Sequence, residues 1–235
     1  MTERSEAAEA RASAERRARE AELDAGLVAR WQAGEREACK ELFERYYPNI
    51  ARFFRTKVRG PGVEEDLVQM TFLRCFEAVS RLREPVAFRS YLFGIACNTL
   101  REHYRGARRE AELLGAPLSR SVLELAGELG PGPSSLLARR EEQRLLLEAL
   151  RRLPVDLQIA LELHYWEDLS TAELAAALEI PHGTAKSTLR RARAQLRRAL
   201  EEESSASPEL ARSLGDLDAW ARAVRAGDRG GKRRP

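Results

Sequence analysis

The stretch LSTAELAAALEIPHGTAKSTLRRARAQLRRAL, residues 169–200, predicts two helices joined by a tight turn. Ser170 is placed to cap the first helix, and Glu173 is spaced to reach back to the cap amide, as in a capping box. A proline and a glycine then interrupt the helical pattern, and Thr184 offers a hydroxyl to cap the second helix. The stretch therefore predicts a helix-turn-helix unit.

The second of these helices has two different faces. Its apolar side chains recur at helical spacing and are expected to face the core: Ala185, Leu189, Ala192, Leu196 and Ala199. Its opposite face is basic, with no acidic residue between positions 183 and 200: Lys186, Arg190, Arg191, Arg193, Arg197 and Arg198. A helix that enters the DNA major groove needs such a face, because basic groups contact phosphates while the helix start reads base edges. The alternative is a solvated basic helix in an ordinary bundle, but a cap, a turn and a one-sided basic helix in this order favour DNA binding.

Composition indicates an all-α protein. Of the 235 residues 33% are charged, but 40 Lys and Arg nearly balance 37 Asp and Glu, which leaves a net charge of +3. The position of the charges is therefore more informative than their sum. Ala, Leu, Glu and Arg dominate, and no sustained alternation of Val, Ile and Thr predicts a strand. The length suffices for two small domains, each with a modest core.

Other classes of function find little support. No apolar run is long enough to span a bilayer and the N-terminus has no apolar signal core, so we expect a cytoplasmic protein without membrane insertion. Cys39, Cys75 and Cys97 form no CxxC pair, and the histidines have no ligand spacing relative to them. We therefore expect no metal site and no cofactor. The sequence also has no recognisable phosphate-binding glycine loop or nucleophile–base pair, which argues against an enzyme.

The first domain is expected over residues 24–109. Residues 1–23 alternate Glu and Arg among alanines with almost nothing to bury, which predicts a disordered or frayed N-terminal arm. Between 42 and 58, apolar and aromatic residues repeat at helical spacing and predict the main core. Pro48 interrupts this run and is expected to kink the helix or to divide it in two.

A further helix of this domain is expected to begin at Val63. Its apolar face is predicted to consist of Leu67, Val68, Phe72, Phe76 and Val79. Its other face carries Asp66, Gln69, Arg74 and Glu77. These side chains are free to meet a partner, although plain solvation is the usual fate of such a face.

The last helix of the domain, expected over residues 86–104, mixes basic and aromatic side chains. They extend to residue 109: Phe88, Arg89, Tyr91, Phe93, Asn98, Arg101, His103, Tyr104, Arg105, Arg108 and Arg109. Aromatic faces stack on unpaired bases and guanidinium groups hold phosphates, so the mixture suits single-stranded nucleic acid. Helical spacing does not separate this role from core packing, which we expect for about half of the aromatic residues.

Two small helical domains joined by a flexible linker are the predicted architecture. Residues 110–135 gather Gly, Pro and Ser and are expected to form the linker. The second domain, with the helix-turn-helix, is expected over 136–200, and residues 201–235 form a C-terminal extension.

With both halves in view, the chain resembles the extracytoplasmic-function (ECF) group of sigma-70 family sigma factors of bacterial RNA polymerase. Four collinear segments carry the resemblance. LFERYYPNIARFF (42–54) and EEDLVQMTFLRCF (64–76) look like the first helix of the promoter-melting domain and the polymerase-docking helix. FRSYLFGIACNTLREHYRGARR (88–109) is similar to the helix that holds the −10 element, and residues 150–198 resemble the −35-reading domain. One departure is Glu102, where the family most often has Asp.

The resemblance implies a factor without catalysis of its own that directs core RNA polymerase to promoters and assists their opening. Binding to the β′ clamp helices of the polymerase would fall to Asp66, Leu67, Gln69, Phe72 and Arg74. Capture of the melted non-template strand at −10 would fall to Arg83, Phe88, Arg89, Asn98, Arg105, Arg108 and Arg109. Contacts with −35 duplex would fall to Thr184, Lys186, Ser187, Arg190, Arg191 and Arg193.

The partners implied are core RNA polymerase (its β′ clamp helices and β flap), promoter DNA, and an anti-sigma factor as a candidate regulator. Two alternatives stay open at this point. An autonomous helix-turn-helix regulator would bind duplex DNA alone, but it has no need of the aromatic and basic surface over residues 24–109. A helical adaptor would bind neither DNA nor polymerase, so co-elution with core polymerase and promoter-dependent transcription separate the three hypotheses.

Overall fold

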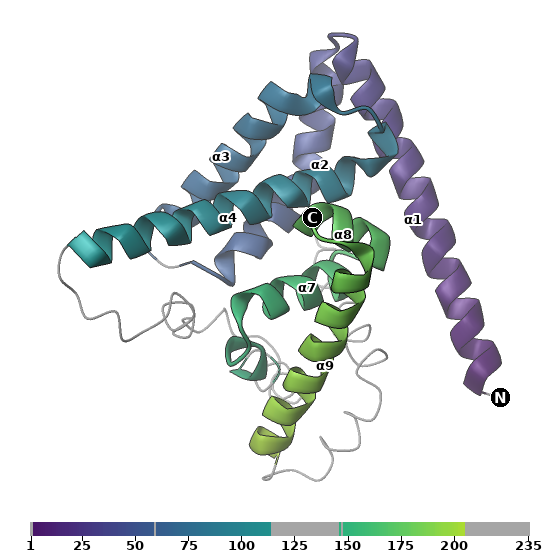
Figure 1. Cartoon of the computed structure of the whole chain (residues 1–235). Helices are drawn as coiled ribbons and strands as arrows, with labels where there is room; N and C mark the ends of the chain where they lie inside the picture. Colours follow the sequence, from purple (N-terminus) through teal and green to yellow (C-terminus); the bar gives the residue numbers. More distant parts are fainter. Residues whose placement is uncertain (1, 59, 114–145, 147, 205–235) are drawn as a thin grey trace, which may run out of the picture.

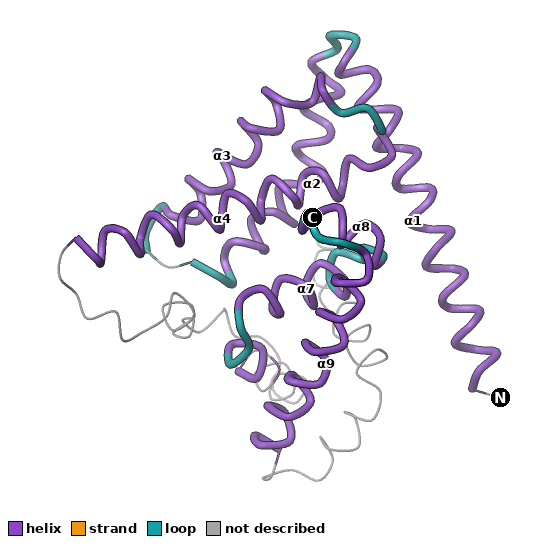
Figure 2. Tube along the Cα trace, in the orientation of Figure 1, coloured by secondary structure: helices purple, strands orange, loops and turns teal. Residues whose placement is uncertain are grey.

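The computed structural model describes residues 2–58, 60–113, 146 and 148–204, and within these ranges it contains helices and no strand (Figure 2). The first elements are α1 (Thr2–Gln32), α2 (Arg36–Arg55), α3 (Val63–Ala78), the 3₁₀ helices η1 (Val79–Arg81) and η2 (Pro85–Ala87), and α4 (Phe88–Leu113). The later elements are α7 (Val155–Tyr165), α8 (Thr171–Leu178) and α9 (His182–Ser204). The prediction of an all-α fold is confirmed.

In the first domain α2 packs against α1 and α3, and α3 packs against α4. The apolar stripe predicted from the spacing is buried along α2, with Leu42, Ile50, Phe53 and Phe54 fully inaccessible. Pro48 lies inside α2 and is exposed, so the alternative of two separate helices is wrong. Burial of the stripe on both sides of the proline outweighs the one backbone hydrogen bond that proline cannot make.

The second domain is a small bundle in which α7 and α8 both pack against α9. Its own core gathers apolar side chains from the helical segment and turn before α7, from α7 itself and from α9: Leu146, Ala149, Leu153, Leu157, Leu161, Tyr165, Ala192, Leu196, Ala199 and Leu200. The three helices therefore hold the basic face of α9 on a rigid support.

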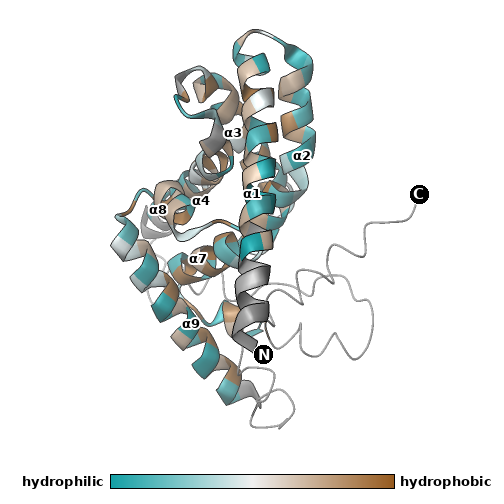
Figure 3. Cartoon of the chain, turned by 90° about the vertical axis from the view of Figure 1, so that its right-hand side faces the viewer, coloured by the Kyte–Doolittle hydropathy of each residue, from teal (hydrophilic) through white to brown (hydrophobic). Residues whose placement is uncertain are grey.

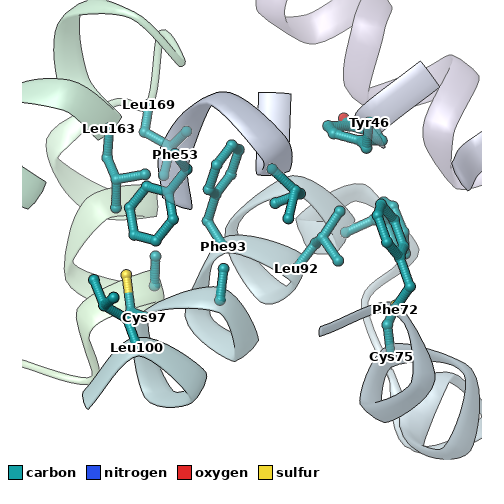
Figure 4. Packing of buried hydrophobic residues seen from close by; sticks show 14 of the residues in the cluster. Tyr46, Phe53, Phe72, Cys75, Leu92, Phe93, Cys97, Leu100, Leu163 and Leu169 are labelled. Atoms are coloured by element: carbon teal, nitrogen blue, oxygen red, sulfur yellow. The ribbon is translucent and has the colours of Figure 1, made fainter. Parts of the chain in front are cut away.

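The two domains pack directly on each other. Helix α8 lies across the N-terminal half of α4 (Figure 1), and Leu163 and Leu169 of the second domain extend the first domain's core beside Phe53 (Figure 4). Gly94 of α4 allows this approach, because a Cβ atom at that position would lie 3.2 Å from the carbonyl oxygen of Ala177. The described residues thus form one closed arrangement.

Ion pairs surround the apolar contact between the domains. The side chain of Lys57 is 1% exposed, donates 2.8 Å to the carbonyl of Phe53 and forms an ion pair with Glu162 of α7. Burial raises the pKa of Glu162, and the positive charge of Lys57 opposes that rise. Glu167 accepts from Asn49 at 2.6 Å and from Arg52, both on α2. Because buried charges need their partners, these pairs fix one register between the domains.

The structure describes the predicted N-terminal arm but only a small part of the predicted linker. Residues 2–23, expected to be frayed or disordered, belong to α1, which continues without interruption into the first domain (Figure 1). Helix α4 extends to Leu113, past the expected end of the domain. The remainder of the predicted linker, the start of the second domain up to residue 145 and positions 205–235 of the extension lie outside the described residues.

Candidate nucleic-acid interface

The α8–α9 pair has the local geometry of a capped helix-turn-helix. The backbone N–H of Glu173 donates to Ser170 Oγ at 3.2 Å, and its carboxylate accepts from the Ser170 N–H at 2.8 Å. The predicted capping box is therefore confirmed. Helix α8 ends at Leu178 and is followed by Glu179, whose φ of 56° lies in the left-handed region that lets the chain reverse into the turn.

Helix α9 begins at His182, earlier than the sequence predicts. Thr184 therefore lies within the first turn of α9 and is not its N-cap; that prediction is wrong. Thr171 Oγ1 lies 3.0 Å from His182 Nε2 and joins the starts of α8 and α9. The hydroxyl of Ser187 donates 2.9 Å to the carbonyl of Thr184, and both side chains are exposed at the start of α9, where major-groove readers contact base edges.

The predicted apolar face of α9 is confirmed, and the predicted basic face is exposed except at Arg193. Ala185, Leu189, Ala192, Leu196 and Ala199 are all buried, and hydrophobic and hydrophilic segments alternate along the helix (Figure 3). The exposed basic side chains are Lys186, Arg190, Arg191, Arg197 and Arg198. Helix α9 thus presents a continuous cationic surface from a buried apolar support.

Arg193 differs from the other basic residues of α9. Its Nε donates to the hydroxyl of Tyr165 at 2.7 Å, and its guanidinium lies 5.5 Å from the centre of the Tyr165 ring. Its NH2 also lies 3.3 Å from His164 Nε2. These contacts tie Arg193 to α7, so in this arrangement it supports the position of α9.

On α4 the predicted −10 residues separate into two groups. Arg105 and Arg109 are exposed on the C-terminal part of the helix, and Arg83 is exposed in the loop before η2. The side chain of Arg108 lies outside the described part of the structure. The remaining members, Phe88 and two polar residues, lie in packed surroundings.

Phe88 is completely buried, and its ring lies 5.5 Å from that of Tyr46. It is a core residue here, and its ring does not face solvent. Asn98 donates 3.0 Å to the carboxylate of Glu179 at the end of α8, and it accepts from Arg101 at 3.0 Å. The closed arrangement therefore covers part of the α4 surface with the helix-turn-helix.

Arg89 is surrounded by acceptors from three parts of the chain. Its guanidinium forms an ion pair with Glu20 of α1, and it also lies 3.5 Å from the Glu167 carbonyl and 3.5 Å from the Tyr46 hydroxyl. Burial by itself would lower the pKa of Arg89, but Tyr46 and Glu20 more than offset this and raise it. Arg89 is thus a charged and well-satisfied side chain.

The residues predicted to bind polymerase do not share one surface of α3. Asp66 and Gln69 are exposed, whereas Leu67 and Phe72 are 5% and 8% exposed and belong to the core. Arg74 forms an ion pair with Glu102 of α4 at 2.6 Å. Glu102, the residue that departs from the family pattern, therefore contacts α3.

An apolar groove between α2 and α3 was not predicted. It encloses about 760 Å³ and is lined mainly by Phe43, Tyr47, Val68, Phe72, Leu73 and Phe76. Phe76, expected in the core, is 57% exposed, and Leu73 is 58% exposed. The sequence feature that could have indicated this groove is the number of apolar residues on α3, which is larger than a single buried face can hold.

The described residues also bear on three other kinds of site, namely metal sites, cysteine sites and membrane spans. Among these residues, no group of three His, Cys, Asp or Glu side chains is placed to hold a metal ion. Cys39, Cys75 and Cys97 are buried free thiols, and burial raises the pKa of Cys75 and of Cys97 to about 12. None of the described helices is both long and apolar enough to cross a membrane.

Comparisons with known proteins account for both domains. The family "Sigma-70 region 2" matches residues 42–110, and "Sigma-70, region 4" matches residues 143–196, which together make up more than half of the chain. The ECF RNA polymerase sigma-E factor of Escherichia coli strain K12 is 30% identical over 174 residues, covering 72% of this chain and 90% of that protein. RNA polymerase sigma-H factor of Pseudomonas aeruginosa is 28% identical over 190 residues, covering 77% and 95%.

A solved structure shares the fold. The structure of CnrH in complex with the cytosolic domain of CnrY matches with a TM-score of 0.56 at 22% identity, over 77% of this chain and 99% of that one. Both family regions, in the order of the sequence, and curated relatives matched over nearly their whole length lead to one conclusion. The chain belongs to the ECF sigma factors of the sigma-70 family, which direct RNA polymerase in transcription initiation.

Proposed function

We propose that this sigma factor holds a promoter with two separate surfaces, α9 for the −35 duplex and the C-terminal part of α4 for the melted −10 strand. The observation that carries the proposal is the cationic face of α9, which stands on a buried apolar support behind a capped helix-turn-helix. The second domain thereby reads intact duplex while the first captures the opened strand.

The start of α9 supports the −35 assignment. Thr184, Lys186 and Ser187 are exposed at the N-terminal end of a helix, where a recognition helix contacts base edges. Arg190 and Arg191 follow one turn later and suit phosphate contacts, which position a helix without reading sequence. Binding through these groups releases counterions, so the affinity for −35 duplex should fall steeply as salt is raised.

The exposed arginines of α4 support the −10 assignment. Arg105 and Arg109 lie beyond the part of α4 that α8 covers, and Arg83 adds a third cation from the preceding loop. Guanidinium groups of this kind hold the phosphates of single-stranded DNA. Trapping an extruded base costs a few kcal/mol of unstacking, which contacts to the opened strand return.

Helix α3 and its apolar groove support the polymerase assignment. Asp66 and Gln69 are exposed beside Leu73 and Phe76, so polar and apolar groups lie on one accessible surface. An exposed apolar groove with polar neighbours is typical of a protein-binding site. We assign this surface to the β′ clamp helices, and the second domain to the β flap.

An anti-sigma factor is proposed as a regulatory partner. The related CnrH was solved in complex with the cytosolic domain of CnrY, and the apolar groove between α2 and α3 gives a protein inhibitor of this chain a surface on which to dock. Such an inhibitor would compete with polymerase for the same face.

The test uses reconstituted holoenzyme and the promoter that it selects. K186A/R191A should weaken binding to −35 duplex about 10- to 100-fold while leaving co-elution with core polymerase unchanged. R36A/K40A, which removes two exposed basic side chains from α2, is the matched control. Asp66→Ala should weaken co-elution with core polymerase and leave the −35 contacts intact. Loss of polymerase binding in K186A/R191A would show that the roles are assigned wrongly.

A further inference from the structure

Helix α1 joins the two domains because it is anchored in one and reaches the other. Its C-terminal half belongs to the first domain, where Leu27, Val28 and Trp31 are buried. Asp24 is 1% exposed and accepts a hydrogen bond from the Tyr46 hydroxyl. Since the helix rises about 1.5 Å per residue, its N-terminal half is carried past the first domain to the level of the second (Figures 1 and 3).

Two neighbouring arginines of α1 contact one carboxylate of the second domain. Arg16 NH2 lies 2.6 Å from Asp168 Oδ2, and Arg17 NH1 lies 3.3 Å from Asp168 Oδ1. Asp168 stands in the loop between α7 and α8 with a left-handed backbone (φ 59°), and its side chain is 11% exposed. Each oxygen of this carboxylate therefore receives a guanidinium from the same helix.

One turn further along α1, Glu20 forms the ion pair with Arg89. The Arg89 side chain is 13% exposed in this pair. A carboxylate in this position occupies the place that a DNA phosphate would need, because both anions bind a guanidinium in the same way. The same helix thus holds the second domain and covers a residue assigned to the −10 strand.

We propose that the N-terminal half of α1 is an intramolecular strap, which acts together with the packing of α8 on α4 to keep the two DNA-binding domains closed and masks Arg89 until the factor engages polymerase and promoter. The masking of Arg89 rests on the proposed function and on the −10 role that the family resemblance implies for this residue, whereas the closing of the domains does not. Ion pairs that remain partly exposed are individually weak. Binding of polymerase and promoter can therefore displace a strap that is held by such pairs.

The test compares two double variants of the full-length chain. R16A/R17A removes both contacts with Asp168, whereas R11A/R19A removes the same charge from exposed positions of α1 that have no ion pair among the described residues. The first readout is the radius of gyration from small-angle X-ray scattering. The second is the affinity for a mixed-sequence single-stranded DNA of 12 nucleotides, measured by fluorescence anisotropy.

R16A/R17A should enlarge the radius of gyration and bind the oligonucleotide roughly two- to tenfold more tightly. R11A/R19A should keep the wild-type dimensions and bind no more tightly, since loss of positive charge by itself weakens DNA binding. Glu20→Gln, which removes the negative charge that pairs with Arg89 and leaves Asp168 untouched, should also bind more tightly. An unchanged radius of gyration in R16A/R17A would overturn the strap.

A further variant separates the strap from the −10 assignment. Adding Arg89→Ala to R16A/R17A should abolish the gain in oligonucleotide affinity while the protein stays expanded. If the gain persists without Arg89, masking of that residue is wrong and the −10 assignment of Arg89 fails, although the expansion still supports the strap as a clamp between domains.

Discussion

Gly94→Ala tests the closed arrangement with a single methyl group. Gly94 lies in the part of α4 that α8 crosses, where a Cβ atom would meet the backbone of Ala177: its carbonyl oxygen at 3.2 Å and its Cα at 3.7 Å. The first distance is shorter than ordinary van der Waals contact, and a backbone carbonyl in a helix cannot rotate away. The closed arrangement must therefore shift to accept the methyl group.

The expected magnitude follows from two opposing effects. Alanine in place of a helical glycine stabilises α4 by about 1 kcal/mol, and it does so whether the domains are closed or separated. Overpacking costs about 1–3 kcal/mol, but only while α8 lies on α4. The helical gain cancels from the equilibrium between closed and separated domains, which should shift by about 1–3 kcal/mol, or about 5- to 150-fold, toward separation.

The assay combines small-angle X-ray scattering with thermal unfolding of the full chain. Gly94→Ala should have a larger radius of gyration and a first domain that is no less stable than in the wild type. Gly106→Ala is the matched control, because Gly106 lies on the same helix and nothing stands within 4 Å of an added Cβ atom. It should stabilise α4 without expanding the protein. An unexpanded Gly94→Ala protein would refute the contact between α4 and α8.

Three further predictions concern single interactions. Glu162→Gln leaves the Lys57 ammonium buried without its counter-ion and should destabilise the closed state by about 3–5 kcal/mol in chemical unfolding, whereas K57M/E162L should restore or exceed wild-type stability. Ser170→Ala removes the cap of α8 and should lower the unfolding free energy by about 1 kcal/mol, with Thr184→Ala, which removes an exposed hydroxyl that caps no helix, as the control. Burial lowers the pKa of His103 below its ordinary value of 6.5, so below pH 6.5 the unfolded state binds more protons and stability should fall with falling pH. His103→Gln should flatten that slope in denaturation curves recorded from pH 7.5 to 5; an unchanged slope would contradict the assignment.

Local patterns predicted the elements of this fold because the physics behind them is local. Ser170 and Glu173 satisfy each other's backbone amides within one turn, so spacing alone was enough to predict the capping box. The apolar face of α9 follows from the helical period, and all five predicted residues of that face are buried. By contrast, the start of α9 depends on the backbone geometry of the turn. The presence of a hydroxyl at Thr184 was therefore not enough to predict that the helix begins at His182.

Contacts between distant segments could not be predicted in the same way. In the sequence, Phe88 and Arg89 have the pattern of residues that face DNA. In the structure, Phe88 is buried against Tyr46, and Arg89 is paired with Glu20, 69 positions away. Phe76 fits the apolar period of α3, and its ring lies 5.9 Å from that of Trp31 on α1, but it remains 57% exposed because this contact covers only part of the side chain. The pairing of Lys57 with Glu162 depends on how the domains dock, which no local pattern encodes.

The most direct test of the account is a footprint of the holoenzyme on one promoter, read at −35 by nuclease protection and at −10 by the permanganate reactivity of unpaired thymines. The wild-type factor should give both signals. K186A/R191A should lose the −35 protection, and R105A/R109A should keep that protection but lose the reactive thymines at −10. If both variants lose the two signals together, or if R105A/R109A opens the promoter normally, the two surfaces do not divide the work as proposed.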